Sequence, residues 1–257
     1  MIDALKATMR EFYRAEAPAS GGRVIEHDGL TAFMTPSAPT QSIVNGVLFD
    51  DVAALGARLP ELARAYRAAD VTHWMVWTMP GEQPAAELLR AAGHLAEYEP
   101  MAMSLTLTQL VDPAAPDVHV TLDRDPHPLE ITTLNERANG EAPGAFGTAF
   151  AGLRDRSFHR YVARVEGRPA ACLVTFDHDG DCMVNWVATE PRLQRCGIGQ
   201  WLAHAALLDA RERGMRTATL QSSYEAERLY ERLGFVAHGR LGMWLWDGPA
   251  TVPGSLA

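Results

Sequence analysis

The sequence lacks several features that would place it in a specialised class of protein. It has only three cysteines in 257 residues, and Cys172, Cys182 and Cys196 form no Cys-x-x-Cys pair. Their spacing implies neither a zinc site nor a disulfide framework. No apolar run approaches the length of a membrane span, and the N-terminus lacks the basic and apolar regions of a signal peptide. We therefore expect a cytoplasmic protein without a metal site.

Positive charge is scarce as well. The 23 Lys and Arg residues are outnumbered by 32 Asp and Glu residues, which gives a formal net charge of −9. This balance argues against bulk binding of nucleic acid and favours a cationic partner such as an amine. It does not exclude an anionic cofactor, because a local loop can bind phosphate on an acidic protein. We expect no nucleic-acid or membrane partner, and a monomer or homodimer.

A glycine-containing loop between a strand and a helix is the most informative stretch. Residues 183–189 have the composition of a strand, residues 200–213 have that of a helix, and Gln194–Gly199 between them reads QRCGIG. The first N–H groups of a helix are unpaired and carry positive potential, and glycines let a phosphate approach the backbone. The loop lacks the Gly-Lys-Ser/Thr of triphosphate-binding loops and the third glycine of the dinucleotide fingerprint. The sequence therefore predicts an anion site of another kind.

Two motifs together resemble one known family. The pattern Gln-x-x-Gly-x-Gly resembles the acyl-CoA pyrophosphate loop of the GNAT N-acetyltransferase superfamily. Residues 226–235, AERLYERLGF, resemble the family's Ala-x-x-Leu-Tyr-x-x-x-Gly-Phe helix and turn. The loop alone is typical of an ordinary tight turn, but both motifs occur in the family's order, separated by one strand. The resemblance covers residues 117–246.

The resemblance implies which residues bind acetyl-CoA, the expected cofactor. They belong to the loop, to the strand before it and to the start of the last helix: Val187, Ala188, Thr189, Gln194, Arg195, Cys196, Gly197, Ile198, Gly199, Gln200 and Ser223. Backbone N–H groups of the strand would polarise the thioester carbonyl. Without the resemblance, residues 187–189 would simply complete a sheet. Ser223 stands where many relatives have asparagine, so a helix-capping role for the serine pair at 222–223 stays open.

Tyr230 is the catalytic candidate. The resemblance places its phenol near the sulfur of CoA, where it would protonate the leaving thiolate. The alternative is packing, because Tyr230 shares an apolar helix face with Ala226, Leu229 and Leu233.

No general base is identified. Alternation along the strand puts Asp181, Met183, Asn185 and Val187 on one face, and its inner positions offer no carboxylate. Asn185 could order a water molecule. His159 is a second candidate, although a single histidine on a strand is more often structural, and His204 is expected to be a surface or packed residue.

The first half of the chain reads as a degenerate copy of the second. The helix that ends at Gly93 aligns with the helix that ends at Gly234, and in this register Leu89 replaces Tyr230. The first copy also lacks the glycine loop. We expect an α/β (α+β) fold of two GNAT-like domains, each a mixed, mostly antiparallel twisted sheet flanked by helices. The alternative is two unrelated α/β halves.

The expected boundaries are a degenerate domain at 1–110, a linker and first strand at 111–128, and a catalytic domain at 117–257. Helices at 129–137 and 144–153 are expected to form a wall of the acceptor site. The predicted function is transfer of an acetyl group from acetyl-CoA to a primary amine of a small molecule, by direct attack in a ternary complex. The alternatives are a non-catalytic acyl-CoA-binding or regulatory protein, and a protein N-acetyltransferase.

Overall fold

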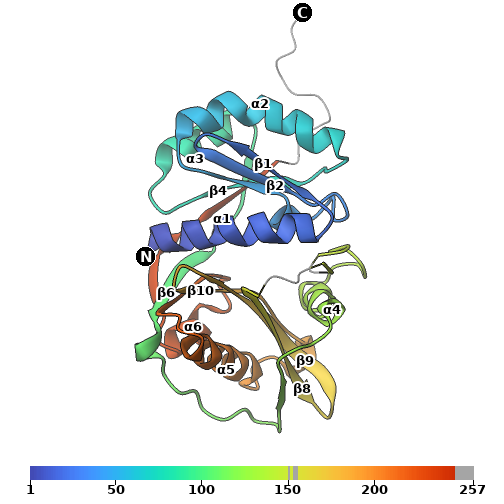
Figure 1. Cartoon of the computed structure of the whole chain (residues 1–257), viewed down its shortest axis with the longest axis vertical. Coiled ribbons are helices and arrows are strands. Elements are labelled where there is room, and N and C mark those ends of the chain that lie inside the picture. Colours follow the sequence, from blue (N-terminus) through green and yellow to red (C-terminus); the bar gives the residue numbers. More distant parts are fainter. Residues whose placement is uncertain (150, 153–155, 247–257) are drawn as a thin grey trace, which may run out of the picture. The chain divides into compact units, whose positions relative to one another are not determined.

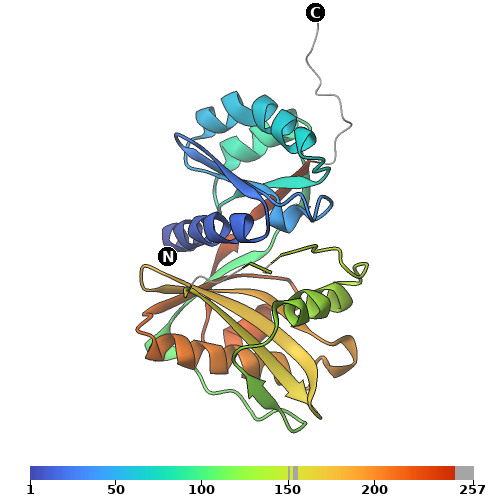
Figure 2. The same cartoon turned by 45° about the vertical axis from the view of Figure 1, so that its right-hand side comes forward.

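A computed structural model describes residues 1–149, 151–152 and 156–246 (Figures 1 and 2). The chain divides into two compact units. Unit 1 comprises Met1–Phe12, Met101–Phe146 and Leu153–Gly239, and unit 2 comprises Tyr13–Pro100, Gly147–Gly152 and Arg240–Ala257. Within the described ranges, no helix is both long enough and apolar enough to cross a membrane.

Unit 2 is built on a six-stranded sheet. Its strands, in spatial order, are β1 (Arg23–His27), β2 (Leu30–Met34), β3 (Gly46–Phe49), β4 (Trp74–Thr78), β13 (Gly242–Trp246) and β5 (Leu95–Tyr98). Only the β3–β4 pair is parallel. Helices α2 (Val52–Ala68) and α3 (Gln83–Ala91) pack on one face, where Leu55, Leu62 and Leu89 join Trp74 in a buried core.

Unit 1 is built on a seven-stranded sheet. Its strands, in spatial order, are β12 (Val236–Arg240), β6 (Met101–Thr106), β11 (Thr217–Ser222), β10 (Asp181–Thr189), β9 (Arg168–His178), β8 (Phe158–Val165) and β7 (Thr121–Asp123). Helices α5 (Ile198–Glu212) and α6 (Glu227–Arg232) share a core with Ala171 and Leu173 of β9. Helix α4 (Pro128–Asn139) packs on the opposite face, where it contacts Cys172.

The remaining helical segments are short or divided between the units. Three 3-10 turns are η1 (Ser42–Val44), η2 (Leu107–Gln109) and η3 (Pro191–Leu193). Helix α1 (Ile2–Ala19) contributes to both units: Thr8 donates a hydrogen bond to the Asp181 carboxylate at 2.9 Å, whereas Tyr13 stacks on Phe33.

The two sheets exchange their last strands. β6 follows β5 directly in sequence, yet β6 pairs with β11 over Met101↔Ser222 to Thr106↔Thr217. β13 follows β12 in the same way, yet it pairs with β4 and β5. The expected domains 1–110 and 117–257 are therefore corrected, because each continuous half contributes one strand to the other sheet. Local composition identifies a strand but does not select its hydrogen-bonding neighbour.

The two halves nevertheless share the spacing of their last elements. Gly93 and Gly234 are 141 positions apart, and the same separation relates the starts of β5 and β12 and the starts of β6 and β13. In the structure, the helix in each half is followed by two strands, β5 and β6 in the first half and β12 and β13 in the second.

The helix expected at 144–153 is wrong for its described part. Residues 143–149 and 151–152 form turns, and Gly144 and Gly147 have left-handed φ values of 83° and 56° that interrupt a helix. Phe150 and Leu153 lie outside the described residues. Helix α4 covers the other helix expected in this region.

Candidate active site

Strands β10 and β11 separate along their length. They pair in parallel from Asp181↔Thr217 to Val184↔Leu220. Both strands continue beyond that point, β10 to Thr189 and β11 to Ser222, without pairing with each other. This unpaired part, here called the β10/β11 opening, leaves backbone groups of β10 without a partner on β11.

A β-bulge precedes the end of β10. Against β9, the register shifts between Asn185 and Ala188, and Trp186 has a left-handed φ of 52°. The extra residue breaks the alternation that the sequence predicted. Val187 therefore packs on the same side as Cys182 and Val184, against the core of α5, and does not share a face with Asn185 as expected.

The bulge also sets the direction of the backbone N–H groups. The N–H of Glu190 donates to the Ala170 carbonyl at 2.8 Å, so the backbone of Glu190 faces β9. Because successive residues of a strand point their backbone groups to opposite sides, Ala188 also faces β9, whereas Val187 and Thr189 face the opening. Of the three strand residues implied for thioester polarisation, these two have suitably directed N–H groups.

The loop after β10 leads into a helix start without a side-chain cap. Gly197 is the N-cap of α5 with φ 78°, and within the described part of the chain no side chain bonds the first N–H groups of the helix. A Cβ atom at Gly199 would lie 3.2 Å from Oγ1 of Thr189, so this glycine lets the helix start pack tightly on β10. The unpaired N–H groups and the helix dipole fit a pyrophosphate.

Gly197 has a second role that the sequence did not predict. A Cβ atom there would lie 3.3 Å from the Cα atom of Pro116 in the linker. The N–H of Asp117 also donates to the Cys196 carbonyl at 3.1 Å. The linker therefore packs directly against the loop.

Other loop residues interact mainly within the protein. Gln194 donates its side-chain amide to the Thr189 carbonyl at 3.3 Å. The side chain of Ile198 is buried in the core, so only its backbone can contact a ligand. Cys196 and Gln200 are half-buried, and Arg195 is exposed with a left-handed φ of 64°.

The helix-capping role considered for the serine pair at 222–223 is not observed. Helix α6 begins at Glu227 with Ala226 as N-cap and no side-chain cap. Ser222 donates instead to the carbonyl of Ser223, and that carbonyl also accepts the Ala226 N–H, so a turn separates the serine pair from the helix. Ser223 is half-buried at the end of β11.

Tyr230 combines a packed ring with an unbonded hydroxyl. The side chain is 4% exposed and lies edge-on to Phe235, with ring centroids 5.6 Å apart. Burial raises the pKa of Tyr230 above its usual value, and none of the described residues hydrogen-bonds its hydroxyl. Leu229, one residue earlier on α6, would approach a Cβ atom at Gly199 to 3.6 Å, so this helix borders the loop.

Asn185, which could order a water molecule, the candidate base His159 and the packed His204 already have partners. Asn185 accepts the Trp186 N–H at 3.1 Å. His159 lies 3.4 Å from the Asp177 carboxylate, and His204 lies 3.0 Å from that of Asp112.

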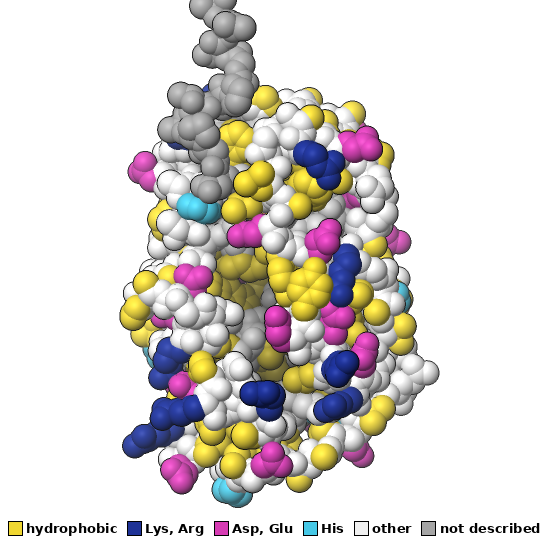
Figure 3. All heavy atoms as spheres, turned by 180° about the vertical axis from the view of Figure 1, so that it is seen from behind, with side chains coloured by type: hydrophobic (Ala, Val, Ile, Leu, Met, Phe, Trp, Pro, Cys, Tyr) yellow, Lys and Arg dark blue, Asp and Glu magenta, His cyan; other side chains and the backbone are white. Residues whose placement is uncertain are grey.

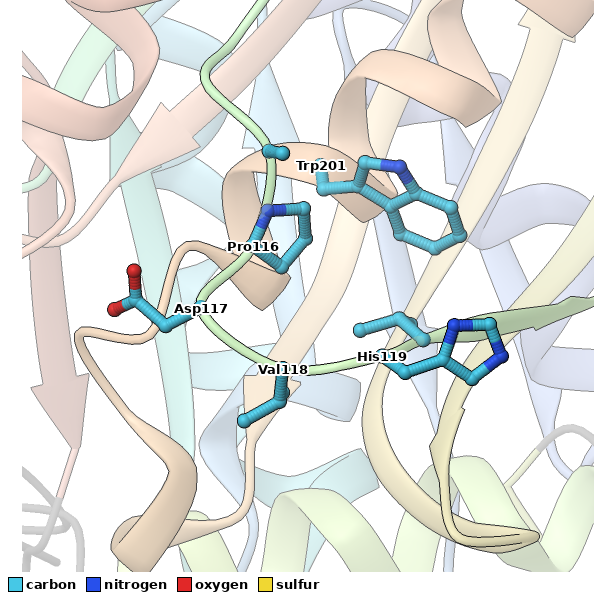
Figure 4. A pocket seen from close by; sticks show the side chains of 7 residues that line it. Pro116, Asp117, Val118, His119 and Trp201 are labelled. Carbon is cyan, nitrogen blue, oxygen red and sulfur yellow. The ribbon is translucent and has the colours of Figure 1, made fainter.

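A shallow pocket of about 430 Å³ adjoins the loop on the side of the linker (Figure 4). It is lined by residues 115–120 and by Trp201 of α5. The Asp117 side chain points away from Trp201 in this view. No residue of β10 or β11 lines it, so this pocket is separate from the β10/β11 opening. Side chains of both charge signs are interspersed on the face shown in Figure 3.

Sequence reasoning missed one residue behind the opening. Asn135 on α4 is 5% exposed and donates to the Trp186 carbonyl at 3.2 Å. Its position four residues after the buried Ile131 was the available signal, because a polar residue at a core-facing helix position needs a buried partner.

The fold and the site together define a class of protein. Such a protein has two mixed, twisted sheets flanked by helices, and one of the two sheets contains a separated strand pair beside an uncapped helix start. Residues 156–237 match the family described as "Acetyltransferase (GNAT) domain". No curated protein sequence matches the chain.

Solved structures of the same class share this fold. A GCN5-related N-acetyltransferase from Kribbella flavida is 19% identical with a TM-score of 0.68, covering 93% of this chain and 96% of that chain. One from Sphaerobacter thermophilus is 16% identical with a TM-score of 0.59, covering 93% and 91%. A tandem GNAT protein from the clavulanic acid biosynthesis pathway is 15% identical with a TM-score of 0.57, covering 86% and 79%.

Residues 156–237 therefore match a GNAT acetyltransferase domain, and the chain has a fold similar to that of solved GNAT structures. The family generally uses acetyl-CoA as its acyl donor.

Proposed function

We propose that the protein is an acetyl-CoA-dependent N-acetyltransferase that acetylates a primary amine of a small molecule. The observation that carries this proposal is the presence of three features in unit 1. They are the open edge of β10, the uncapped start of α5 and the unbonded hydroxyl of Tyr230. In the proposed reaction, acetyl-CoA supplies an activated acyl group as a thioester, and the amine attacks it directly in a ternary complex.

The start of α5 would hold the pyrophosphate. Four N–H groups at a helix start have no partner within the helix, and here no side chain caps them. The glycine at 199 keeps the approach free of a side chain. Arg195 adds a positive charge to the loop, which compensates locally for the acidic balance of the chain.

Val187 would polarise the thioester carbonyl. Its N–H faces the β10/β11 opening and is fixed by the bulge, so it needs no rearrangement when negative charge develops on the carbonyl oxygen. A preorganised backbone donor of this kind typically contributes about 10²–10³-fold to the rate.

Tyr230 would stabilise the leaving sulfur. Because burial raises its pKa, the hydroxyl stays protonated at neutral pH and can donate a hydrogen bond. A free thiol has a pKa of about 8.5, below that of tyrosine, so complete proton transfer from Tyr230 to a thiolate is uphill. Hydrogen-bond donation to sulfur as its charge develops is therefore the role that the environment of Tyr230 favours.

The test combines binding and turnover. Purified protein should bind acetyl-CoA and release free thiol with at least one member of a panel of amines, namely polyamines, amino sugars, aminoglycosides and amino-acid amides. Peptides with free N-termini serve as the comparison class. Tight binding without thiol release from any amine would instead identify a non-catalytic acyl-CoA-binding protein, and peptide-only turnover would identify a protein N-acetyltransferase.

A further inference from the structure

One side chain of α4 reaches the bulge of β10 from behind. The Nδ2 atom of Asn135 lies 2.9 Å from the carbonyl oxygen of Ile131 and 3.2 Å from that of Trp186. The amide has two protons, so it can donate to both oxygens. One bond stays within α4, and the other crosses to β10.

The bulge needs such support because its conformation is unfavourable. A left-handed φ costs a residue other than glycine about 1–2 kcal/mol and persists only where the surroundings impose it. At Trp186, Asn185 accepts the N–H at 3.1 Å and Asn135 donates to the carbonyl. The Phe146 ring lies edge-on to the indole, with centroids 4.8 Å apart.

The direction of the Val187 N–H depends on this bulge. If β10 paired with β9 without the extra residue, each later residue would turn to the opposite side. The Val187 N–H would then face β9 and leave the opening. Whatever holds Trp186 in place therefore also fixes the donor that faces a thioester carbonyl.

We propose that Asn135 is a positioning residue for acyl transfer, which acts through the Trp186 carbonyl to fix the Val187 N–H in the β10/β11 opening. The inference rests on the proposed function, because it assumes that a thioester carbonyl lies in that opening. Asn135 itself lies on the opposite face of the sheet from α5 and does not touch the ligand.

A neighbouring thiol limits the size of the effect. The Sγ atom of Cys172 lies 3.6 Å from the Trp186 carbonyl, and burial raises the pKa of this thiol to about 12, although the Ala188 backbone opposes the rise. The thiol therefore keeps its proton, but it is a weaker and more distant donor than the Asn135 amide. Loss of Asn135 should loosen the bulge without removing every contact, so kcat should fall by about 10- to 100-fold.

The experiment uses the full chain with Asn135→Ala and Asn135→Asp. Asn139→Ala is the matched control, because Asn139 lies one turn later on α4 and donates to the Asn135 carbonyl at 2.9 Å. The main readout is the infrared stretch of the carbonyl in acetyl-CoA labelled with ¹³C at that carbon. It is measured on the complex without an acceptor, together with the Kd for CoA.

We expect the carbonyl frequency of acetyl-CoA to fall when it binds to the wild type. Asn135→Ala should reduce that shift. The Kd of this variant for CoA should stay within about twofold of the wild-type value, because the start of α5 is intact. Asn139→Ala should keep the full shift. In Asn135→Asp the ionised carboxylate cannot donate, whereas the protonated acid can donate once. Its kcat relative to the wild type should therefore rise as the pH falls. If Asn135→Ala does not fold, the same measurements on the nearly isosteric Asn135→Asp test the inference.

Two results would overturn the inference. A full carbonyl shift in both Asn135 variants, with normal kcat per folded molecule, would show that Asn135 only supports stability and would leave the proposed function standing. If the wild type shows no carbonyl shift and no thiol release with any amine, the proposed function fails and this inference fails with it.

Discussion

The Oδ1 atom of Asp51 accepts the backbone N–H of Ala53 at 2.9 Å, so the start of α2 is capped by a carboxylate of the protein itself. Helix α2 follows β3 in unit 2 as α5 follows β10 in unit 1, and in both units that strand has a parallel neighbour. The start of α5 has Gly197 and no cap. The helix starts at corresponding positions in the two units therefore differ in whether their first N–H groups are left uncapped, which is what a phosphate requires.

From this difference we predict one acetyl-CoA molecule per chain, measured as the stoichiometry in calorimetry. Asp51→Ala should lower stability by about 1 kcal/mol, typical of a lost N-cap, and leave the stoichiometry and Kd unchanged. Two equivalent sites per chain would show that the first half also binds the cofactor.

Substitution at Gly199 should affect binding more than folding. Gly199→Val places branched carbons beside Thr189 at the helix start, so the Kd for acetyl-CoA should rise at least tenfold, measured by calorimetry. Unchanged affinity in a folded variant would exclude this loop as the phosphate site.

Gly197→Ala should weaken binding and stability together. The residue must adopt φ 78°, and the added carbon approaches Pro116 of the linker. Gly214→Ala is its matched control, because Gly214 has φ 92° just beyond the other end of α5 with no atom near the added carbon. The control should lose stability through strain but keep its affinity for acetyl-CoA.

Tyr230→Phe should lower kcat and kcat/KM together and leave the Kd for CoA nearly unchanged. The ring still fills the core, and only the hydroxyl is lost. A preorganised hydrogen-bond donor to developing charge contributes about 10²–10³-fold, and a loss within or just below that range is expected in steady-state kinetics.

The control for Tyr230 is Tyr161→Phe. Tyr161 is also buried in unit 1, but its hydroxyl accepts a hydrogen bond from Arg213 at 3.0 Å. This variant should lose thermal stability and keep its kcat. A normal kcat in Tyr230→Phe, measured with a true acceptor, would show that Tyr230 only packs in the core and has no catalytic role.

Stability should depend on pH through Glu16 of α1. Burial raises the pKa of this carboxyl to about 7, although a hydrogen bond from Ser20 at 2.6 Å opposes the rise. The pKa of Glu16 is higher in the folded state than in the unfolded state. Its contribution to the free energy of unfolding is therefore complete below about pH 4.5 and is lost as the pH rises to about 7. The loss would be about 3 kcal/mol.

The measurement is Tm against pH for the wild type, Glu16→Gln and the exposed control Glu87→Gln. The wild type and the control should show the decline between pH 4.5 and 7, and Glu16→Gln should lack that component. Parallel curves for all three proteins would contradict a raised pKa for Glu16.

Removal of β13 should unfold part of the sheet to which it is hydrogen-bonded. A chain truncated after Arg240 should lose protection from hydrogen exchange at β4 and β5, which lie more than 140 residues earlier in sequence. The β10–β11 pair should keep its protection. Loss at β11 with retention at β4 would contradict the observed pairing.

The sequence predicted most elements because their signals are local. The strand expected at 183–189 lies within β10, and the helices expected at 129–137 and 200–213 overlap α4 and α5. The acetyltransferase family was also predicted, because the loop and the Tyr230 helix keep a fixed order.

Long-range choices were not predictable in the same way. The bulge at Trp186 depends on Asn135, about fifty positions earlier, so alternation along the strand placed Val187 on the wrong face. The pairing of β6 with β11 likewise joins two strands that are far apart in sequence. The helix-capping role considered for the serine pair at 222–223 is not observed, because a turn intervenes before the helix.

The exchanged strands make the chain equivalent to a domain-swapped dimer joined into one polypeptide. A cut in the linker between β6 and β7 would give two fragments, each holding a strand that completes the other fragment's sheet. Neither fragment could satisfy its own sheet edge alone, whereas the two expressed together would complement each other. The linker therefore keeps two mutually dependent halves at a fixed one-to-one ratio.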